Sequence, residues 1–285
     1  MSTKDTLRNI SFLVEVKRAF DSITWALNTE GYKLTHKSKR QKDYSISFCI
    51  TCKGRLWQLE QTLRKNIDDN ADYDKCNFIL IDYNSKDGLE QWIKNNFSKE
   101  IENGKLIYFK NNNFKLFQMA HAKNLSHRLA EGEVVVNLDG DNFTNKGFAN
   151  YVNSMFKAHP NILLHSGNSN GTAGRIAVLK KHFIGVNGYD ESFKVNYYEE
   201  VDYINRLKRK FGLFEIRIPE KYLENLDNAI KNNENKAYSK VLQKAINANK
   251  LKIEENKSKS LKTINPNGYA KGAFVKNFKK KIVLN

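Results

Sequence analysis

Short apolar segments alternate with amphipathic segments between residues 46 and 139, and this order constrains the fold more than any other feature. The apolar segments cover residues 46–50, 78–81, 106–109 and 134–138. Leucine and isoleucine recur at helical spacing after the first of them, and further helices are predicted around 89–97 and 119–130. Strands that alternate with helices predict an α/β fold with a mostly parallel central sheet, covered by helices on both faces.

Polar residues follow directly on three of these predicted strands. Thr51, Asp82 and Asp139 each stand where an apolar segment ends. The carboxyl ends of parallel strands meet on one side of a sheet, and ligands of α/β proteins bind there. We therefore expect these three residues to border one site.

Two carboxylates, Asp139 and Asp141, end the fourth apolar segment with one glycine between them. Residues i and i+2 of an extended segment project to the same side, so both carboxylates can face one cation. Oxygen-only ligation suits Mg²⁺ or Mn²⁺, and such an ion could neutralise a diphosphate. A solvated turn is the alternative for so short a motif. An EF-hand is excluded, because Thr144 and Asn150 occupy the positions that require Gly and Glu.

The chain of 285 residues is long enough for one large domain, or for one domain with appendages, and 40% of its residues are hydrophobic. No apolar run approaches the ~20 residues that a membrane span needs, and the N-terminus lacks the layout of a secretory signal. A cytoplasmic location is therefore expected. Cys49, Cys52 and Cys76 are odd in number and lack a second zinc-binding pair, which argues against disulfides and zinc.

The formal net charge is +17, and the C-terminal segment carries most of it. Residues 231–285 contain fourteen Lys and three Glu. Such a tail is usually a solvated face, but it also attracts anionic lipid, nucleic acid or polyanionic glycans. Within it, residues 237–253 have an apolar stripe flanked by lysines. This pattern predicts an amphipathic helix that either packs on the main domain or lies on a membrane surface.

A second acidic group, Glu199, Glu200 and Asp202, opens a predicted helix. Acidic residues in a first helical turn interact favourably with the helix dipole, so capping alone would explain them. A carboxylate at that place with access to a pocket could instead act as a general base.

Six sets of residues occur in an order that is more informative than any one of them. They are Thr51-Cys-Lys-Gly-Arg55, Asp82-Tyr-Asn-Ser-Lys-Asp87, Ala120-His-Ala-Lys-Asn124, Asp139-Gly-Asp141, Gly174-Arg-Ile-Ala-Val178 with Asn187-Gly-Tyr-Asp190, and Glu199-Glu-Val-Asp-Tyr-Ile-Asn-Arg-Leu207. Over residues 45–210 this order resembles the GT-A glycosyltransferases of the family-2 type. The second half is similar to beta-1,4-galactosyltransferases and polypeptide N-acetylgalactosaminyltransferases. The resemblance implies a Rossmann-like GT-A fold and an inverting transfer of sugar from a UDP-sugar to a hydroxyl acceptor.

The resemblance also implies a role for each matching residue. Thr51, Arg55, Asp82 and Asn84 would hold the nucleoside, Lys123 would support the diphosphate, and Gly174 and Arg175 would contact the donor. Asn187, Gly188, Tyr189, Glu199 and Asp202 would border the donor sugar and the acceptor. Asp139 and Asp141 would bind Mn²⁺ or Mg²⁺, with Asn228 in place of the histidine that related enzymes supply. Glu200 stands at the position of the family's catalytic Asp and would remove the proton from the acceptor hydroxyl.

These residue types fit the chemistry of sugar transfer. Charge builds on the departing nucleoside diphosphate in an oxocarbenium-like transition state, where a cation and Lys123 can stabilise it. One carboxylate on the opposite face of the sugar leads to inversion, without an enzyme nucleophile.

Three parts are expected along the chain. An N-terminal helical extension covers 1–43, the GT-A catalytic domain covers 44–220, and a basic C-terminal helical tail covers 221–285. Within the catalytic domain, 44–142 is the nucleotide-binding half and 143–220 the acceptor half. The expected acceptor is a surface polysaccharide or lipid-linked glycan, with the basic tail available for peripheral contact with a membrane.

Three other functions remain open at this point. Tyr269, Phe274 and Phe278 interleave with lysines, as in a glycosyltransferase that acts on modified DNA or in a nucleic-acid-binding protein. A sugar-phosphate nucleotidyltransferase would need a Gly-rich first loop, and residues 51–55 contain only Gly54. An inactive glycan-binding relative would not depend on Asp139.

Overall fold

The computed structural model describes residues 23–33, 35, 38, 42–167, 171–193, 198–226 and 236–285, with the side chains of the last range from 243 onward. Asn228, the predicted third metal ligand, lies outside these residues, and so does most of the predicted N-terminal extension. Residues 23–33 are helical. Tyr32 of this helix stacks on Phe214, with ring centroids 4.2 Å apart, so the described end of the extension packs on the main domain.

In the described part of the chain, nine strands form one sheet in the order β11-β10-β3-β2-β1-β4-β7-β6-β8. Their bounds are β1 (Ile46–Cys52), β2 (Cys76–Asp82), β3 (Leu106–Lys110), β4 (Val134–Asn137), β6 (Ile162–His165), β7 (Ile176–Leu179), β8 (Phe214–Arg217), β10 (Gly272–Lys276) and β11 (Lys280–Leu284). β3, β2, β1 and β4 are parallel neighbours, and β6 is parallel to β8. β7, β10 and β11 pair antiparallel with their neighbours. The sequence prediction of an α/β fold with a mostly parallel sheet is confirmed.

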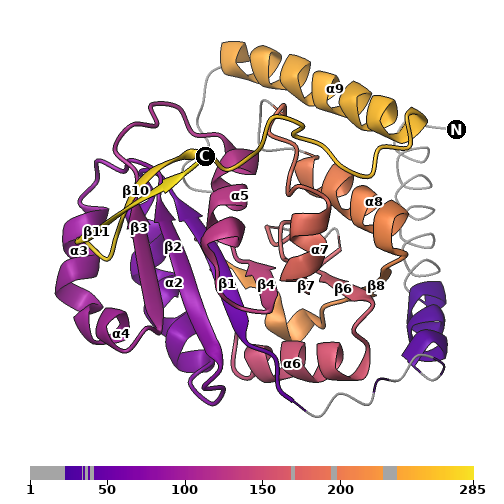
Figure 1. The fold of residues 1–285 in the computed structure, drawn as a ribbon, viewed down its shortest axis with the longest axis horizontal. Helices are drawn as coiled ribbons and strands as arrows, with labels where there is room; N and C mark the ends of the chain where they lie inside the picture. The colour runs from indigo at the N-terminus through magenta and orange to yellow at the C-terminus, as the bar shows by residue number, and fades with distance from the viewer. Residues whose placement is uncertain are drawn as a thin grey trace, which may run out of the picture.

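Helices cover both faces of this sheet (Figure 1). One core lies under α2 (Leu56–Asp69), α3 (Leu89–Asn96) and α6 (Phe148–Ala158), and the other under α5 (Met119–Leu129), α7 (Lys180–Gly185) and α8 (Glu199–Phe211). Shorter elements are α4 (Ser98–Glu102), the 3-10 helix η1 (Glu220–Tyr222), and β5 (Asn142–Phe143), which pairs with β9 (Glu224–Asn225). Along β1, Phe48 and Ile50 face the first core and Cys49 faces the second. Both sides of the strand are apolar because both are covered.

The C-terminal segment differs from the helical tail that the sequence predicts. It contains α9 (Lys236–Ser258), but it then returns to the main sheet as the hairpin β10–β11, drawn in yellow in Figure 1. Val275 of β10 pairs with Lys110 of β3. The segment is helical only in part, because its last residues pair with β3 and place Phe274 in the second core. The domain boundary at residue 221 stays a prediction.

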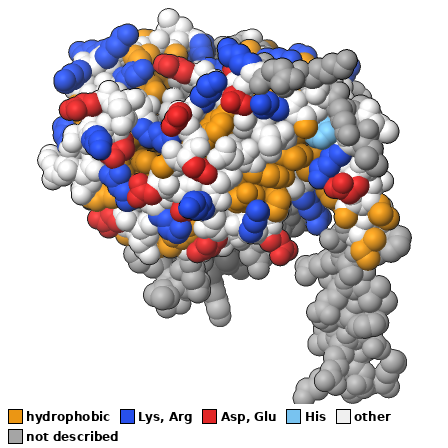
Figure 2. Space-filling model, turned by 90° about the horizontal axis from the view of Figure 1, so that it is seen from below, with side chains coloured by type: hydrophobic (Ala, Val, Ile, Leu, Met, Phe, Trp, Pro, Cys, Tyr) orange, Lys and Arg blue, Asp and Glu red, His pale blue; other side chains and the backbone are white. Residues whose placement is uncertain are grey.

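The aromatic residues of this segment pack inside the protein. Phe274 is 2% exposed and belongs to the second core. Phe278 packs on Tyr108, with ring centroids 5.1 Å apart, and Tyr269 packs against the second core. On the face drawn in Figure 2, Lys and Arg side chains mix with Asp and Glu and do not form one positive field. Phe274 is therefore not free to stack on a nucleic-acid base, as the alternative of a nucleic-acid-binding protein would require.

The amphipathic helix predicted at 237–253 is α9, which contacts α8. Its buried side chains, Asn249, Ile253 and Asn256, lie on one side, and Leu251 is exposed. The described part of α9 therefore packs on the main domain, which was one of the two alternatives. Among the described residues, no helix combines the length and the apolar composition that crossing a membrane requires.

Candidate active site

A cavity of about 360 Å³ opens at the carboxyl ends of β1 and β4. These strands are parallel neighbours, so the loops that follow them come together. Four residues that the sequence predicts for the site line the cavity, namely Thr51, Arg55, Asp139 and Asp141. A wider groove of about 780 Å³ runs along α6, but none of its lining residues is acidic. We therefore place the candidate active site at the smaller cavity.

The two aspartates of the motif lie on the loop between β4 and β5. Asn137 donates a hydrogen bond of 3.1 Å to Oδ1 of Asp139, and Asn142 donates one of 2.9 Å to Oδ1 of Asp141. Thr62 of α2 fixes the loop between them through a 2.7 Å bond to the carbonyl of Gly140. These hydrogen bonds hold both carboxylates in place at the wall of the cavity, where they are partly exposed.

A divalent cation fits this donor set in charge and chemistry. Among the described residues, no group of three or more His, Cys, Asp or Glu side chains converges as a metal site. Two carboxylates at a cavity suffice for Mg²⁺ or Mn²⁺, because such ions commonly complete their coordination with phosphate oxygens and water. Asp139 and Asp141 are the pair that would hold the ion.

Arg175, predicted to contact the donor, lies behind this loop instead of in the cavity. Its side chain is fully buried, and its guanidinium donates to the carbonyl of Tyr222 and to Oδ1 of Asn142. Burial lowers the pKa of Arg175 to about 10, although Asp139 and Asp141 act in the opposite direction. The guanidinium therefore places positive charge behind the two aspartates and fixes β5, which follows them.

Gly174 lies where the aspartate loop meets α8. A Cβ atom at this position would come within 2.7 Å of Oδ2 of Asp139 and within 3.4 Å of Oε1 of Glu200. The carboxylates of Asp139 and Glu200 therefore converge on the same point, although 61 positions separate them in the sequence. Only a residue without a side chain allows this approach, which explains why Gly174 stands there.

Lys123 of α5 joins the same group from the side of the second core. Its Nζ lies 3.1 Å from Oε1 of Glu199 and forms a short ion pair with Oε1 of Glu200. Its side chain is 2% exposed, against 20% for Glu200. The ammonium also lies 5.5 Å above the ring centre of Tyr189. Lys123 thus contacts the two glutamates and does not line the cavity where a diphosphate was expected.

The charges of this group shift its protonation equilibria. Burial opposes the charged form of Lys123, but the carboxylates of Glu200, Glu199 and Asp139 raise its pKa well above the usual value. Burial would also raise the pKa of Glu200, yet the charge and hydrogen bond of Lys123 outweigh it and lower that pKa. Burial raises the pKa of Glu199 to about 7, against the effect of Lys123. Glu200 is therefore the glutamate that stays ionised at neutral pH.

Asp82 and Asn84, predicted to hold the nucleoside, form a turn at the end of β2 and do not line the cavity. Asp82 is fully buried, and its two oxygens accept bonds from the backbone N–H of Ser85 at 2.7 Å and from the hydroxyl of Tyr108 at 2.6 Å. Asn84 has a φ of 64° and donates to the carbonyl of Phe114. As they lie here, both residues shape the loops around the cavity.

Several cavity residues escaped the sequence prediction, among them Lys53, Phe117 and Met119. Lys53 donates to the carbonyls of Tyr83 and Phe114, at 3.1 and 3.0 Å, and burial lowers its pKa. Its position between Thr51 and Arg55 was a usable signal. Phe117 comes from the loop before α5 and Met119 is the first residue of that helix, where the sequence pattern gave no indication of a ligand.

Asn187, Gly188 and Tyr189 do not border the cavity either. Oδ1 of Asn124 accepts a 2.7 Å bond from the backbone N–H of Tyr189, and a Cβ at Gly188 would lie 2.3 Å from that oxygen. Tyr189 is fully buried and stacks on Tyr203, with ring centroids 4.2 Å apart. This segment connects α5 to α8, and the ring of Tyr189 lies against the ammonium of Lys123.

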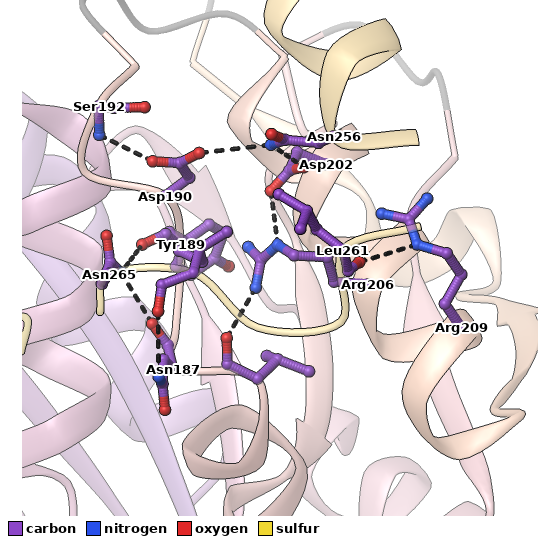
Figure 3. A network of polar contacts seen from close by, with 12 residues as sticks. Asn187, Tyr189, Asp190, Ser192, Asp202, Arg206, Arg209, Asn256, Leu261 and Asn265 are labelled. Carbon is purple, nitrogen blue, oxygen red and sulfur yellow. Dashed lines mark hydrogen bonds and ion pairs between the residues drawn. The ribbon is translucent and has the colours of Figure 1, made fainter. Parts of the chain in front are cut away.

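Asp202 links α8 to α9, as Figure 3 shows. Its carboxylate accepts a 2.7 Å bond from Nε of Arg206 and a 2.9 Å bond from Nδ2 of Asn256. Its side chain is 1% exposed. Asp202 is therefore a structural partner of the C-terminal segment in this arrangement.

Comparison with known families gives one match. Residues 47–211 match the family described as Glycosyl transferase family 2. The match begins in β1 and ends with α8, so it contains both aspartates and both glutamates described above. No curated protein sequence matches the chain.

Many solved structures share the fold, among them two glycosyltransferases. The mannosyltransferase PcManGT from Pyrobaculum calidifontis, solved with GDP-Man and Mn²⁺, superposes with a TM-score of 0.54 at 15% identity, over 76% of this chain and 68% of that one. GalNAc-T7, solved with UDP, GalNAc and Mn²⁺, gives a TM-score of 0.53 at 15% identity, over 63% of this chain and 43% of that one. This chain thus spans less than half of GalNAc-T7, and at such identities the likeness concerns the fold alone.

Proposed function

This chain belongs to glycosyl transferase family 2, and from that premise we propose that it moves a sugar from a UDP-sugar to a hydroxyl group of a glycan acceptor, with inversion at the sugar carbon. It is a nucleotide-sugar-dependent glycosyltransferase of the GT-A type. The observation that carries the proposal is the convergence of Asp139 and Glu200 at Gly174. Asp139 lines the cavity, and Glu200 lies in the first turn of α8.

The cavity is where we place the donor. Thr51 and Arg55 line it together with Lys53, which brings two basic residues to a place where a diphosphate needs them. Asp139 and Asp141 would hold Mn²⁺ or Mg²⁺, an ion that offsets charge on the leaving diphosphate when bound. PcManGT and GalNAc-T7 were both solved with Mn²⁺, which supports this assignment.

Glu200 is our assignment for the general base. Its carboxylate is partly exposed, and Lys123 keeps it ionised, so it can accept a proton at neutral pH. The acceptor oxygen attacks the anomeric carbon while the bond from that carbon to the diphosphate breaks. The hydroxyl proton passes to Glu200, and the nucleoside diphosphate leaves. A base on the face opposite the leaving group gives inversion.

Lys123 takes a different role from the one that the family resemblance implies. Its ammonium is engaged by Glu199 and Glu200 and is almost fully buried. We therefore assign it to the base, which it orients and keeps charged. Lys53 and Arg55 are our candidates for contact with the diphosphate.

The acceptor that we propose belongs to a surface polysaccharide or a lipid-linked glycan, made in the cytoplasm where nucleotide sugars are available. The basic C-terminal segment supports a peripheral contact with an anionic membrane. The burial of Phe274 removes the feature that favoured modified DNA as the acceptor.

A panel of nucleotide sugars tests the proposal. Purified protein is incubated with each donor and Mn²⁺, and release of UDP or GDP is measured with and without glycan acceptors. We expect release from a UDP-sugar, and release slowed by at least ~10²-fold in the Asp141→Ala and Glu200→Gln variants. Asp74→Asn is the control, because Asp74 is exposed just before the amino end of β2, away from the cavity. Full activity in either site variant would overturn the assignment.

A further inference from the structure

The last part of the chain touches both sides of the candidate active site, although it lies outside the segment that matches the family. The match ends at residue 211. Residues 256–274, which we call the C-terminal strap, run from the end of α9 into β10. One end of the strap contacts the loop that walls the donor cavity, and the other contacts the segment before α8.

On the donor side, Asn111 connects the strap to the loop between β3 and α5. Its Nδ2 donates a 2.7 Å bond to the carbonyl of Ala273, while its Oδ1 accepts bonds from the backbone N–H groups of Asn113 and Phe114, at 2.7 and 2.8 Å. Asn111 is buried. One side chain thus fixes the beginning of the loop and ties it to β10.

Gly272 provides the space in which this loop packs. A Cβ there would lie 2.8 Å from Cζ of Phe114 and 3.0 Å from Cζ of Phe274. Phe114 stacks on Tyr83, with ring centroids 4.6 Å apart, and its carbonyl accepts the bond from Lys53. The same loop then supplies Phe117 to the cavity wall. The strap therefore sets the position of a donor-side wall.

On the acceptor side, Asn265 holds the segment that precedes α8. Its Nδ2 donates 2.8 Å bonds to the carbonyls of Asn187 and Tyr189 (Figure 3). Its Oδ1 accepts a 3.2 Å bond from the backbone N–H of Glu191. The carboxylate of Glu191 in turn accepts a 2.8 Å bond from the backbone N–H of Ala270. These contacts hold Tyr189, whose buried ring lies against the ammonium of Lys123.

We propose that the C-terminal strap is a positioning element of the active site, which holds the donor-side loop through Asn111 and Gly272 and the acceptor-side segment through Asn265. Reading the cavity as the donor site rests on the proposed function. The physical connection between the strap and the two segments does not. A glycosyltransferase of this kind would then need residues beyond its family-matched region to bind its substrates normally.

Gly272→Ala tests the donor side. We expect the added methyl group to displace Phe114, to speed amide hydrogen exchange in residues 111–118, and to raise the donor KM about tenfold, with residues 187–191 unchanged. Val283→Ala is the matched control, because Val283 is 65% exposed in the same hairpin and should alter neither quantity. Phe114→Ala removes the ring that the methyl group would strike. In that background Gly272→Ala should have a smaller further effect, because only the 3.0 Å contact with Phe274 remains.

Asn265→Ala tests the acceptor side and should give the converse result, with faster exchange in 187–191, a raised acceptor KM and an unchanged donor KM. If Gly272→Ala does not fold, Asn111→Ala replaces it, since this variant removes the bond to Ala273 without adding atoms. Wild-type exchange and KM values in folded variants would overturn the proposal. If the wild-type protein used no nucleotide sugar, the proposed function would fail, and the exchange measurements alone would decide on the strap.

Discussion

Lys123 and Glu200 form an ion pair between a buried ammonium and a partly exposed carboxylate, with side-chain exposures of 2% and 20%. The pair joins α5 to the first turn of α8, and Glu199 shares the same ammonium. The buried ammonium therefore stabilises the charge of a carboxylate that is still partly exposed.

Removing the cation should move the pH dependence of activity. Lys123 lowers the pKa of Glu200, and the base must be deprotonated to act, so Lys123→Met should raise that pKa and shift the acidic limb of kcat/KM to higher pH. Lys123→Arg should restore part of the wild-type profile. Donor affinity, measured as the binding of UDP with Mn²⁺, should change little. A large loss of UDP binding would show instead that Lys123 contacts the diphosphate.

The length of the base side chain should matter. Glu200→Asp withdraws the carboxylate by one methylene, and we expect kcat to fall by roughly 10²-fold, as for a misplacement of about 1 Å. Glu200→Gln should cost ~10²–10⁴-fold, the usual range for loss of a general base. Steady-state rates at saturating donor measure both. Equal activity of Gln and Glu at this position would exclude a base role.

Gly174→Ala should weaken the metal site without unfolding the protein. The methyl carbon would lie 2.7 Å from Oδ2 of Asp139, so this carboxylate must move. We expect the Mn²⁺ concentration for half-maximal activity to rise ~10–100-fold, the usual cost when the groups that orient a metal ligand are disturbed. Gly31→Ala is the control, because nothing lies within 4 Å of a Cβ there. Unchanged Mn²⁺ dependence would contradict the geometry.

Asn256→Ala should destabilise the fold more than it affects the chemistry. Asn256 is buried and donates to Asp202 at 2.9 Å and to Asp190 at 3.4 Å, so its loss leaves two buried carboxylates short of a donor. We expect the free energy of unfolding to fall by ~1–3 kcal/mol in urea titrations. Asn247→Ala, at an exposed position of the same helix, should cost much less.

The basic C-terminal segment should bind DNA only weakly at physiological salt. Phe274 is buried, so Phe274→Ala should lower the free energy of unfolding by ~3–5 kcal/mol and leave any retention on a DNA column unchanged. Elution from DNA over a salt gradient is the measurement. Strong retention at 150 mM salt, lost on substitution of the exposed lysines 279–281, would revive the nucleic-acid interpretation.

Local patterns in the sequence were enough to locate the centre of the site. Thr51 and Asp139 could be placed because apolar runs end beside them, and parallel strands bring such ends together. Asp139 and Asp141 lie two residues apart on one loop. Glu200 could be found because acidic residues open a helix of clear periodicity. In each case the information lies within a few residues.

Contacts between distant parts of the chain could not be predicted in the same way. Asp82 accepts a bond from Tyr108 and so is occupied within the fold, and Lys123 meets glutamates that lie 76 and 77 positions further along the chain. The pairing of β10 with β3 joins residues more than 160 positions apart, and nothing local marks it. The role of each of these residues depends on which side chain it contacts in the folded protein, and a sequence motif does not show that contact.

The hairpin β10–β11 has a practical consequence for where this chain can be shortened. β3 has β2 on one side and β10 on the other. A fragment that stops at the family limit would expose the free N–H and C=O groups of β3 along with the apolar surface that Phe274 now covers. Bare strands of this kind pair with other molecules and promote aggregation. Expression of the minimal family segment should therefore give insoluble material, whereas in the intact chain β10 covers this edge of β3.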